Sequence, residues 1–291
     1  MIRVGTRGST LALAQARWVT ERLGEEAELV TVTTSGDRGS DADKSRWINE
    51  LELALLADEI DLAVHSAKDV PAELAGGLAV LAIPLRADPR DVICGVGSLT
   101  ALAPGARVGT SSLRRMAQIR AARPDLEVVP LRGNVDTRLR KLGEGQADAL
   151  VLAAAGLERL GRSGEAGGTL EQLVPAAGQG ALLIEGRPGA LPAEQLSELS
   201  DGVSSACVNA ERELVRALGA SCNTPVGAYA RPLDGSSEIE LTAWAGLPDG
   251  SEWISDRLRG APGRLGEAVA QRMRDVGAGE LLAHAERKVE A

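Results

Sequence analysis

Strand-like and helix-like segments alternate along the first two-thirds of this 291-residue chain, and no other feature restricts its fold as much. Ile2–Thr6 is predicted to be a strand, and Leu11–Leu23 a helix that starts at Ser9 and Thr10 and ends at Gly24. Repeated strand–helix–strand units form largely parallel sheets covered by helices. The pattern therefore predicts an α/β fold.

The later elements of this region continue the alternation. Further strands are predicted at Glu28–Thr34, Asp61–Ser66, Leu78–Leu85, Arg107–Thr110, Leu126–Leu131 and Ala147–Ala153, and further helices at Trp47–Asp58, Leu113–Ala122, Val135–Leu142 and Ala155–Leu160. Ser35–Arg46 is polar and loop-like, and no internal repeat of fixed period is visible.

The last third of the chain has a different pattern, typical of a small α+β domain. The predicted elements are a helix at Ser204–Leu218, strands at Pro225–Arg231, Glu238–Ala245 and Ser251–Leu258, and one amphipathic helix at Leu265–Ala285. Two Pro- and Gly-rich stretches, Arg86–Arg90 and Val174–Gly180, are predicted crossover linkers.

The composition favours a globular protein of the cytosol. Hydrophobic residues make up 44% of the chain, and the longest apolar run, Ala149–Ala155, is too short to span a bilayer. No secretory signal is visible at the start of the chain. Three cysteines (Cys94, Cys207 and Cys222) fit neither a disulfide framework nor a CxxC metal site, and two histidines exclude a histidine-rich metal centre. We therefore expect no metal.

Charge is distributed unevenly along the chain. The net charge of −9 argues against general binding to nucleic acid or to membrane surfaces. Between Gly105 and Leu142, however, eight arginines and one lysine face only three acidic residues, a local charge of +6. This stretch indicates either a site for a small polyanion or a solvated helix face.

Three predicted strand-to-helix turns combine arginine with glycine or small hydroxyl residues: Thr6–Ser9, Gly109–Arg115 and Arg132–Arg138. A helix N-terminus presents unpaired N–H groups that stabilise a carboxylate or phosphate, and arginine adds bidentate hydrogen bonds. A serine in such a turn is usually only a cap. Three such turns together favour a multivalent anion site.

The segment His65–Pro71 follows a predicted strand, at the end of a sheet where α/β proteins bind ligands. Its acid, base and hydroxyl groups are suited to proton transfer. The alternative is that Lys68 and Asp69 are surface charges and that His65 packs in the sheet.

The segment Gly219–Pro225 places Cys222 among polar, turn-forming residues, which favours an exposed and modifiable thiol. Cys94 and Cys207 lie in apolar surroundings and are expected to be structural.

Taken in order, these motifs resemble the porphobilinogen deaminase family over nearly the whole chain. The matching blocks are Val4–Ser9 with Leu11–Gln15, His65–Pro71, Gly109–Arg115, Leu131–Arg138, Ala155–Leu160, Ala177–Gly180, and Cys222 with Pro225–Gly227. Each block is modestly specific, whereas the ordered set is highly specific.

The resemblance implies two α/β domains of the periplasmic-binding-protein type 2 fold and a small C-terminal α+β domain that carries the cofactor cysteine. The implied bounds are 1–87 with 179–200, 88–178 and 201–291. It also implies a cytoplasmic monomer that condenses four porphobilinogen molecules head to tail, with loss of ammonia, into hydroxymethylbilane. The implied cofactor is a dipyrromethane in thioether linkage to Cys222.

The resemblance also assigns roles to individual residues. Asp69 would be the catalytic carboxylate, which stabilises an azafulvenium-like cation and moves protons. The implied cofactor ligands are Cys222, Lys68, Ser66, Ser111, Arg114, Arg115, Arg132 and Arg138, and the implied substrate ligands are Arg7, Ser9, Ser112, Arg159 and Gln179. Because each porphobilinogen carries an acetate and a propionate, the growing chain is a dense polyanion, which gives the local positive charge a purpose.

Two segments depart from the family pattern. Asp43–Trp47 keeps Lys44, expected in an active-site loop, and an aromatic residue, but lacks the family's glycines. Ala220–Pro225 keeps the thiol with altered neighbours.

Two other functions are considered as alternatives. A non-catalytic anion receptor would need neither Cys222 nor Asp69. A nucleic-acid-binding module is disfavoured because the basic stretch contains no aromatic residue for base stacking.

Overall fold

The computed structural model describes residues 1–32, 45–220 and 224–290, and it divides the chain into two compact units. Unit 1 comprises Met1–Ala87 and Gly180–Ala206, and unit 2 comprises Asp88–Gln179 and Cys207–Ala291. The chain passes between the units inside both stretches that were predicted to be linkers. The division into three domains stays a prediction.

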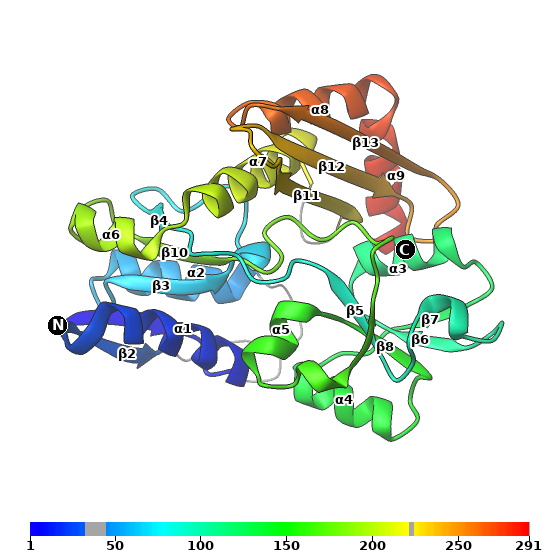
Figure 1. Cartoon of the computed structure of the whole chain (residues 1–291), viewed down its shortest axis with the longest axis horizontal. Helices are drawn as coiled ribbons and strands as arrows, with labels where there is room; N and C mark the ends of the chain where they lie inside the picture. Colours follow the sequence, from blue (N-terminus) through cyan, green and yellow to red (C-terminus); the bar gives the residue numbers. More distant parts are fainter. Residues whose placement is uncertain (33–44, 221–223, 291) are drawn as a thin grey trace. The chain divides into compact units, whose positions relative to one another are not determined.

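Unit 1 is built on a five-stranded sheet with the order β2-β1-β3-β10-β4 (Figure 1). Its strands are β1 (Ile2–Thr6), β2 (Ala27–Thr31), β3 (Leu62–Ser66), β4 (Ala79–Ala82) and β10 (Leu182–Gly186). β1 pairs in parallel with β2 and β3, whereas β10 runs antiparallel to both β3 and β4.

Helices cover both faces of this sheet: α1 (Thr10–Leu23), α2 (Ser45–Leu56) and α6 (Ala193–Leu199). Alternate residues of β3 enter two separate cores, because successive side chains of a strand point to opposite faces. Leu62 and Val64 pack with Val19 of α1, whereas Ala63 packs with Leu55 of α2. The carboxyl end of β3 is therefore held between two buried layers.

The sheet of unit 2 repeats this arrangement, with the order β7-β6-β8-β5-β9. Its strands are β5 (Asp91–Cys94), β6 (Arg107–Gly109), β7 (Glu127–Val129), β8 (Ala149–Ala153) and β9 (Ala166–Thr169). β6 is parallel to β7 and β8, and β5 is antiparallel to β8 and β9. In each sheet the chain adds the antiparallel strand, β10 or β5, directly after it arrives from the other unit.

The remaining elements of unit 2 are helices on its sheet and a C-terminal α+β part. The helices are α3 (Leu113–Ala122), α4 (Val135–Gly143) and α5 (Ala154–Arg159). The C-terminal part contains α7 (Gly202–Leu218, which begins in unit 1), an antiparallel meander of β11 (Val226–Pro232), β12 (Ile239–Gly246) and β13 (Trp253–Gly260), and then α8 (Leu265–Asp275) and α9 (Ala278–Glu290) (Figure 1). Within the parts of the chain that the structure describes, no helix combines the length and apolarity needed to cross a membrane.

Two expectations about the secondary structure are wrong. The sheets are mixed rather than largely parallel, because β5 and β10 enter antiparallel. The single helix predicted at Leu265–Ala285 is two helices, since the chain breaks at Gly277, whose φ of 97° belongs to the left-handed region that glycine adopts easily.

Candidate active site

Two of the predicted motifs of unit 1 lie at one edge of its sheet. β1 and β3 are parallel neighbours, so their carboxyl ends meet there. β1 leads into Arg7 and Ser9, and β3 leads into Ser66, Lys68 and Asp69. The structure thus brings the predicted catalytic carboxylate and one of the predicted anion-binding turns to the same sheet edge.

The turn that carries Asp69 is a short 3₁₀ helix, Ala67–Asp69, directly after β3. The backbone N–H of Ala67 donates to the carbonyl of Ala181 at 3.0 Å. The hydroxyl of Ser66 lies 2.8 Å from the side-chain nitrogen of Gln15 on α1. Lys68 and Asp69 are half-buried, so this turn is an ordered part of the sheet edge rather than a pair of solvated charges.

The predicted anion-binding residues of unit 2 lie at the corresponding edge of its sheet. β6, β7 and β8 are parallel neighbours, so the turns that follow them share one edge. Ser111, Ser112, Arg114 and Arg115 follow β6, Arg132 and Arg138 follow β7, and Arg159 ends the helix after β8.

In all three predicted turns a side chain caps the helix that follows. This agrees with the simpler interpretation of these turns, in which the serine is only a helix cap. Ser9 accepts from the N–H of Ala12, and Ser112 accepts from the N–H of Arg115. In the third turn the cap is Asn134, which the sequence did not single out. The oxygens of Ser9 and Ser112 therefore already serve the helices, whereas the buried hydroxyl of Ser111 has no hydrogen-bond partner among the residues the structure describes.

The two predicted arginines of α3 meet a carboxylate that the sequence analysis missed. Asp91, the first residue of β5, is fully buried. Its two oxygens lie 2.8 Å from the guanidinium of Arg114 and 2.8 Å from that of Arg115. Gln179, a predicted substrate ligand, donates to Asp91 at 2.8 Å. Three predicted ligands thus share one buried partner.

This cluster carries an excess of positive charge, because two guanidinium groups share one carboxylate. Burial alone would raise the pKa of the Asp91 carboxyl, but the charges of Arg114 and Arg115 hold it well below its usual range. Burial lowers the pKa of Arg114, and Asp91 offsets this only in part. The Nε–H of Arg114 is buried and has no hydrogen-bond partner in the described part of the chain. This N–H and the unpaired Ser111 hydroxyl are two donors that could bind a carboxylate of a ligand. These residues therefore fit an anionic cofactor.

We expect Asp91→Asn to destabilise the protein by about 3–5 kcal/mol at neutral pH, because it leaves two arginines buried without a counter-charge. Since the folded pKa of Asp91 is depressed, its stabilising effect is complete above about pH 4 and is lost as the pH falls towards the folded value. The difference in free energy of unfolding between wild type and variant should therefore become smaller in acid. Urea unfolding at neutral pH and at about pH 3 measures it; a constant difference would contradict the assignment.

The other predicted arginines of unit 2 differ in exposure. Arg132 is exposed, and Arg138 is half-buried and donates to the carbonyl of Gly133 at 2.7 Å. Burial lowers the pKa of Arg159 to about 10. A guanidinium that has lost much of its hydration gains more from a bound carboxylate than a fully hydrated one does.

Part of the basic stretch from Gly105 to Leu142 behaves as a solvated helix face, which was the alternative to a polyanion site. Arg107, Arg123 and Arg140 each form an ion pair with a nearby acidic residue at the surface. Such exposed pairs contribute about 0–1 kcal/mol and need no ligand. The polyanion interpretation therefore applies to the arginines at the sheet edge and not to the whole stretch.

The structure describes two of the three cysteines. Cys94 and Cys207 are buried, which confirms the expectation that they are structural. Burial raises the pKa of the Cys94 thiol to about 11, so its reactive thiolate is scarce. Cys222 and Lys44 lie outside the described residues.

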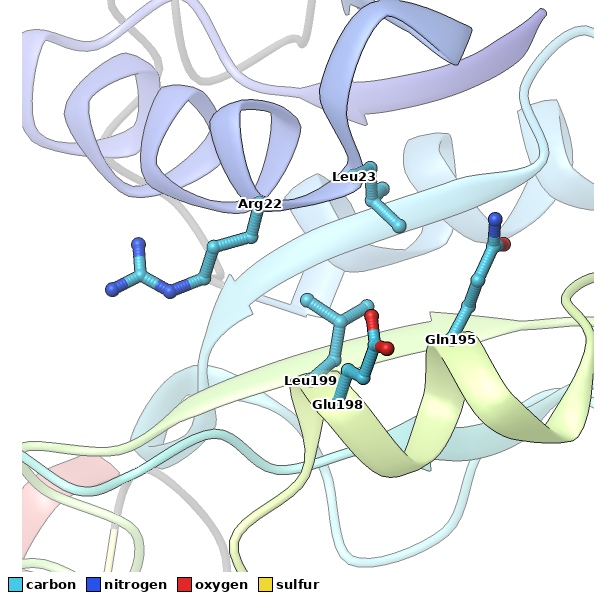
Figure 2. A pocket seen from close by; sticks show the side chains of 5 residues that line it. All are labelled: Arg22, Leu23, Gln195, Glu198 and Leu199. Carbon is cyan, nitrogen blue, oxygen red and sulfur yellow. The ribbon is translucent and has the colours of Figure 1, made fainter.

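A cavity of about 280 Å³ lies elsewhere in unit 1, between the end of α1 and α6 (Figure 2). It is lined by Arg22, Leu23, Gln195, Glu198 and Leu199. None of these residues belongs to the predicted site.

The family relationship of the chain follows from comparison with known proteins. Residues 2–194 match the family model "porphobilinogen deaminase, dipyromethane cofactor binding domain", and residues 205–275 match the model of the C-terminal domain of the same family. These matches confirm the predicted fold class and the predicted type of cofactor.

Individual relatives extend over nearly the full length. The chain is similar to the porphobilinogen deaminase of Thiobacillus denitrificans, with 45% identity over 97% of both chains. It is also similar to that of Thermus thermophilus, with 46% identity over 97% of this chain and 98% of the relative.

Solved structures that resemble the chain include a periplasmic substrate-binding protein of an ABC transporter from Coxiella burnetii, with 16% identity, a TM-score of 0.43, and coverage of 71% of this chain and 94% of that one. A methionine-binding protein has 15% identity and a TM-score of 0.43, with coverage of 73% and 89%. With both family models and these full-length relatives in agreement, the chain belongs to the porphobilinogen deaminase family.

Proposed function

We propose that this chain condenses four porphobilinogen molecules head to tail, with loss of ammonia, into the linear tetrapyrrole hydroxymethylbilane, and that Asp69 is its catalytic carboxylate. The observation that carries the proposal is the set of partly or fully desolvated arginines at a sheet edge of an acidic chain. Two of them, Arg114 and Arg115, share a single carboxylate. Such sites suit a substrate whose every unit bears two carboxylates.

The residues proposed to hold the dipyrromethane are Cys222, as its covalent attachment, and Lys68, Ser66, Ser111, Arg114, Arg115, Arg132 and Arg138. The burial of Cys94 and Cys207 supports Cys222 as the attachment point. When bound, the dipyrromethane supplies the pyrrole carbon to which substrate is joined. Arg7, Ser9, Ser112, Arg159 and Gln179 are proposed to bind substrate, and Lys44 to lie in an active-site loop.

Asp69 acts on the reacting substrate as an ionised carboxylate. As ammonia leaves, positive charge develops on the pyrrole, and a fixed negative oxygen stabilises that charge more effectively than mobile water does. The same carboxylate accepts the proton that the ring carbon loses after the new carbon–carbon bond forms, and it passes that proton on to the released ammonia. The half-buried position of Asp69 after β3 supports this role.

We also propose that the protein is a cytoplasmic monomer that binds no nucleic acid. The net charge of −9 and the ion-paired arginines of the basic stretch support the last point. Gel filtration with light scattering tests the monomer; a stable dimer would overturn it.

An anion receptor of the same fold is the main alternative, since fold does not fix function. An acidic aldehyde reagent that colours pyrroles distinguishes the two on the purified, denatured protein. The enzyme should give a coloured band and release ammonia from porphobilinogen. A colourless band without ammonia release would favour the receptor.

A further inference from the structure

Three buried titratable side chains of unit 1 have no role in the chemistry proposed above. Glu185 on β10 is fully buried, and His65 on β3 and Glu52 on α2 are nearly so. The Nε2 of His65 lies 3.0 Å from a carboxylate oxygen of Glu185. We call Glu52, His65 and Glu185 the acid cluster. Ionisable groups are rarely placed in a core without a specific use.

The sheet register explains how the acid cluster forms. Glu185 is paired with Ala63, so it points to the same face as Ala63 and His65, the face that α2 covers. Glu52 projects from α2 towards this face: burial raises the pKa of its carboxyl, and the nearby Glu185 raises it further. The three side chains therefore share one buried site between the sheet and α2.

The acid cluster holds both ends of the segment that contains Asp69. At one end, His65 is paired with Glu185 four residues before Asp69. At the other end, the backbone N–H of Ala75 donates to the carboxylate of Glu52 at 3.0 Å. On the opposite face of the sheet, Ser66 contacts Gln15. The residues from 65 to 75 are thus anchored to β10, α2 and α1 together.

We propose that the acid cluster is a positioning device for Asp69, with Glu185 as its central member. The inference rests on the proposed function, because it requires Asp69 to act on the substrate. A carboxylate that stabilises developing charge must be held close to its working position, and a displacement of about 1 Å costs up to about a hundredfold in rate. His65 then serves as an anchor and not as the acid–base group of the motif.

The test is Glu185→Gln, measured per molecule of folded, cofactor-loaded protein. We expect kcat to fall about ten- to a hundredfold while KM changes little, because the contact matters in the transition state rather than in substrate binding. The double variant His65→Gln with Glu185→Gln should be no slower than the slower single variant, since both changes break one contact. Additive losses would overturn the proposal.

Asp61→Asn is the matched control. Asp61 lies directly before β3, at the end of the strand away from Asp69. Its carboxylate accepts from the backbone N–H of Arg3 at 2.7 Å and from the guanidinium of Arg3 at 2.8 Å. Its loss should lower the melting temperature but leave kcat unchanged. If Glu185→Gln lowers only the melting temperature, as Asp61→Asn does, the acid cluster is structural and the proposal fails.

Two further results keep the test decisive. If Glu185→Gln does not fold, Glu52→Met replaces it, because methionine keeps the volume of the side chain but removes the oxygen that accepts from the Ala75 N–H. In that variant kcat should again fall with KM nearly constant, and an unchanged kcat would overturn the proposal. If wild type itself consumes no porphobilinogen, the proposed function fails. If wild type turns over and the variants match it, only the positioning role fails.

Discussion

Asp69→Asn should leave the protein folded and lower kcat by about 10²–10⁴-fold, the usual contribution of a positioned acid–base group. Asparagine has nearly the same shape as aspartate, so the half-buried turn after β3 should keep its packing. The amide, however, carries no negative charge for the developing cation and cannot move a proton. Ammonia release per cofactor-loaded molecule measures the loss, and circular dichroism verifies the fold.

Glu73→Gln is the control for Asp69→Asn. Glu73 is an exposed carboxylate four residues further along the chain, and its neutralisation should leave the rate nearly unchanged. Near-normal turnover of Asp69→Asn would remove Asp69 from the central role. A loss of the same size in both variants would show that the general negative charge of the region matters rather than this one carboxylate.

Cys222→Ser should abolish turnover altogether and remove the pyrrole colour from the denatured protein. A serine oxygen does not form the thioether, so the chain would have no covalent anchor for the growing product. The matched control is Cys207→Ala, which removes a buried thiol of unit 2. That variant should keep the colour and the activity and should lose only stability, since it leaves a small cavity. A coloured Cys222→Ser protein would place the attachment elsewhere.

Local sequence signals predicted many of the elements, because those elements depend on local physics. Leu113–Ala122 is a helix with the predicted ends, since Ser112 caps it. β5, β9 and β10 were not predicted as strands. In β9, Ala-Gly-Gly-Thr, two of the four residues are glycines and only Thr169 favours a strand. Its glycines are explained only in the fold, where a Cβ on Gly168 would lie 1.9 Å from the carbonyl oxygen of Gly97. A single sequence does not reveal such a close approach.

The same limit applies to the candidate site. The arginines after β6 and β7 could be predicted from their turns, because an arginine near a helix start is a local pattern. Their partners could not: Asp91 lies 24 positions from Arg115 and 88 positions from Gln179. Glu185 and His65 are likewise joined only by the antiparallel pairing of β10 with β3, and the sequence analysis predicted no strand where β10 lies. The sequence therefore indicated which groups are proposed to bind an anion but not which groups hold them in place.

The central claim is that this chain builds a tetrapyrrole on a covalently bound dipyrromethane. The most direct test is the intact mass of the purified protein by electrospray, before and after addition of porphobilinogen. We predict a mass above that of the chain by two linked pyrrole units, then further steps of one pyrrole unit each with substrate, all absent in Cys222→Ser. A bare chain mass that stays unchanged after incubation with porphobilinogen would contradict the account and favour an anion receptor.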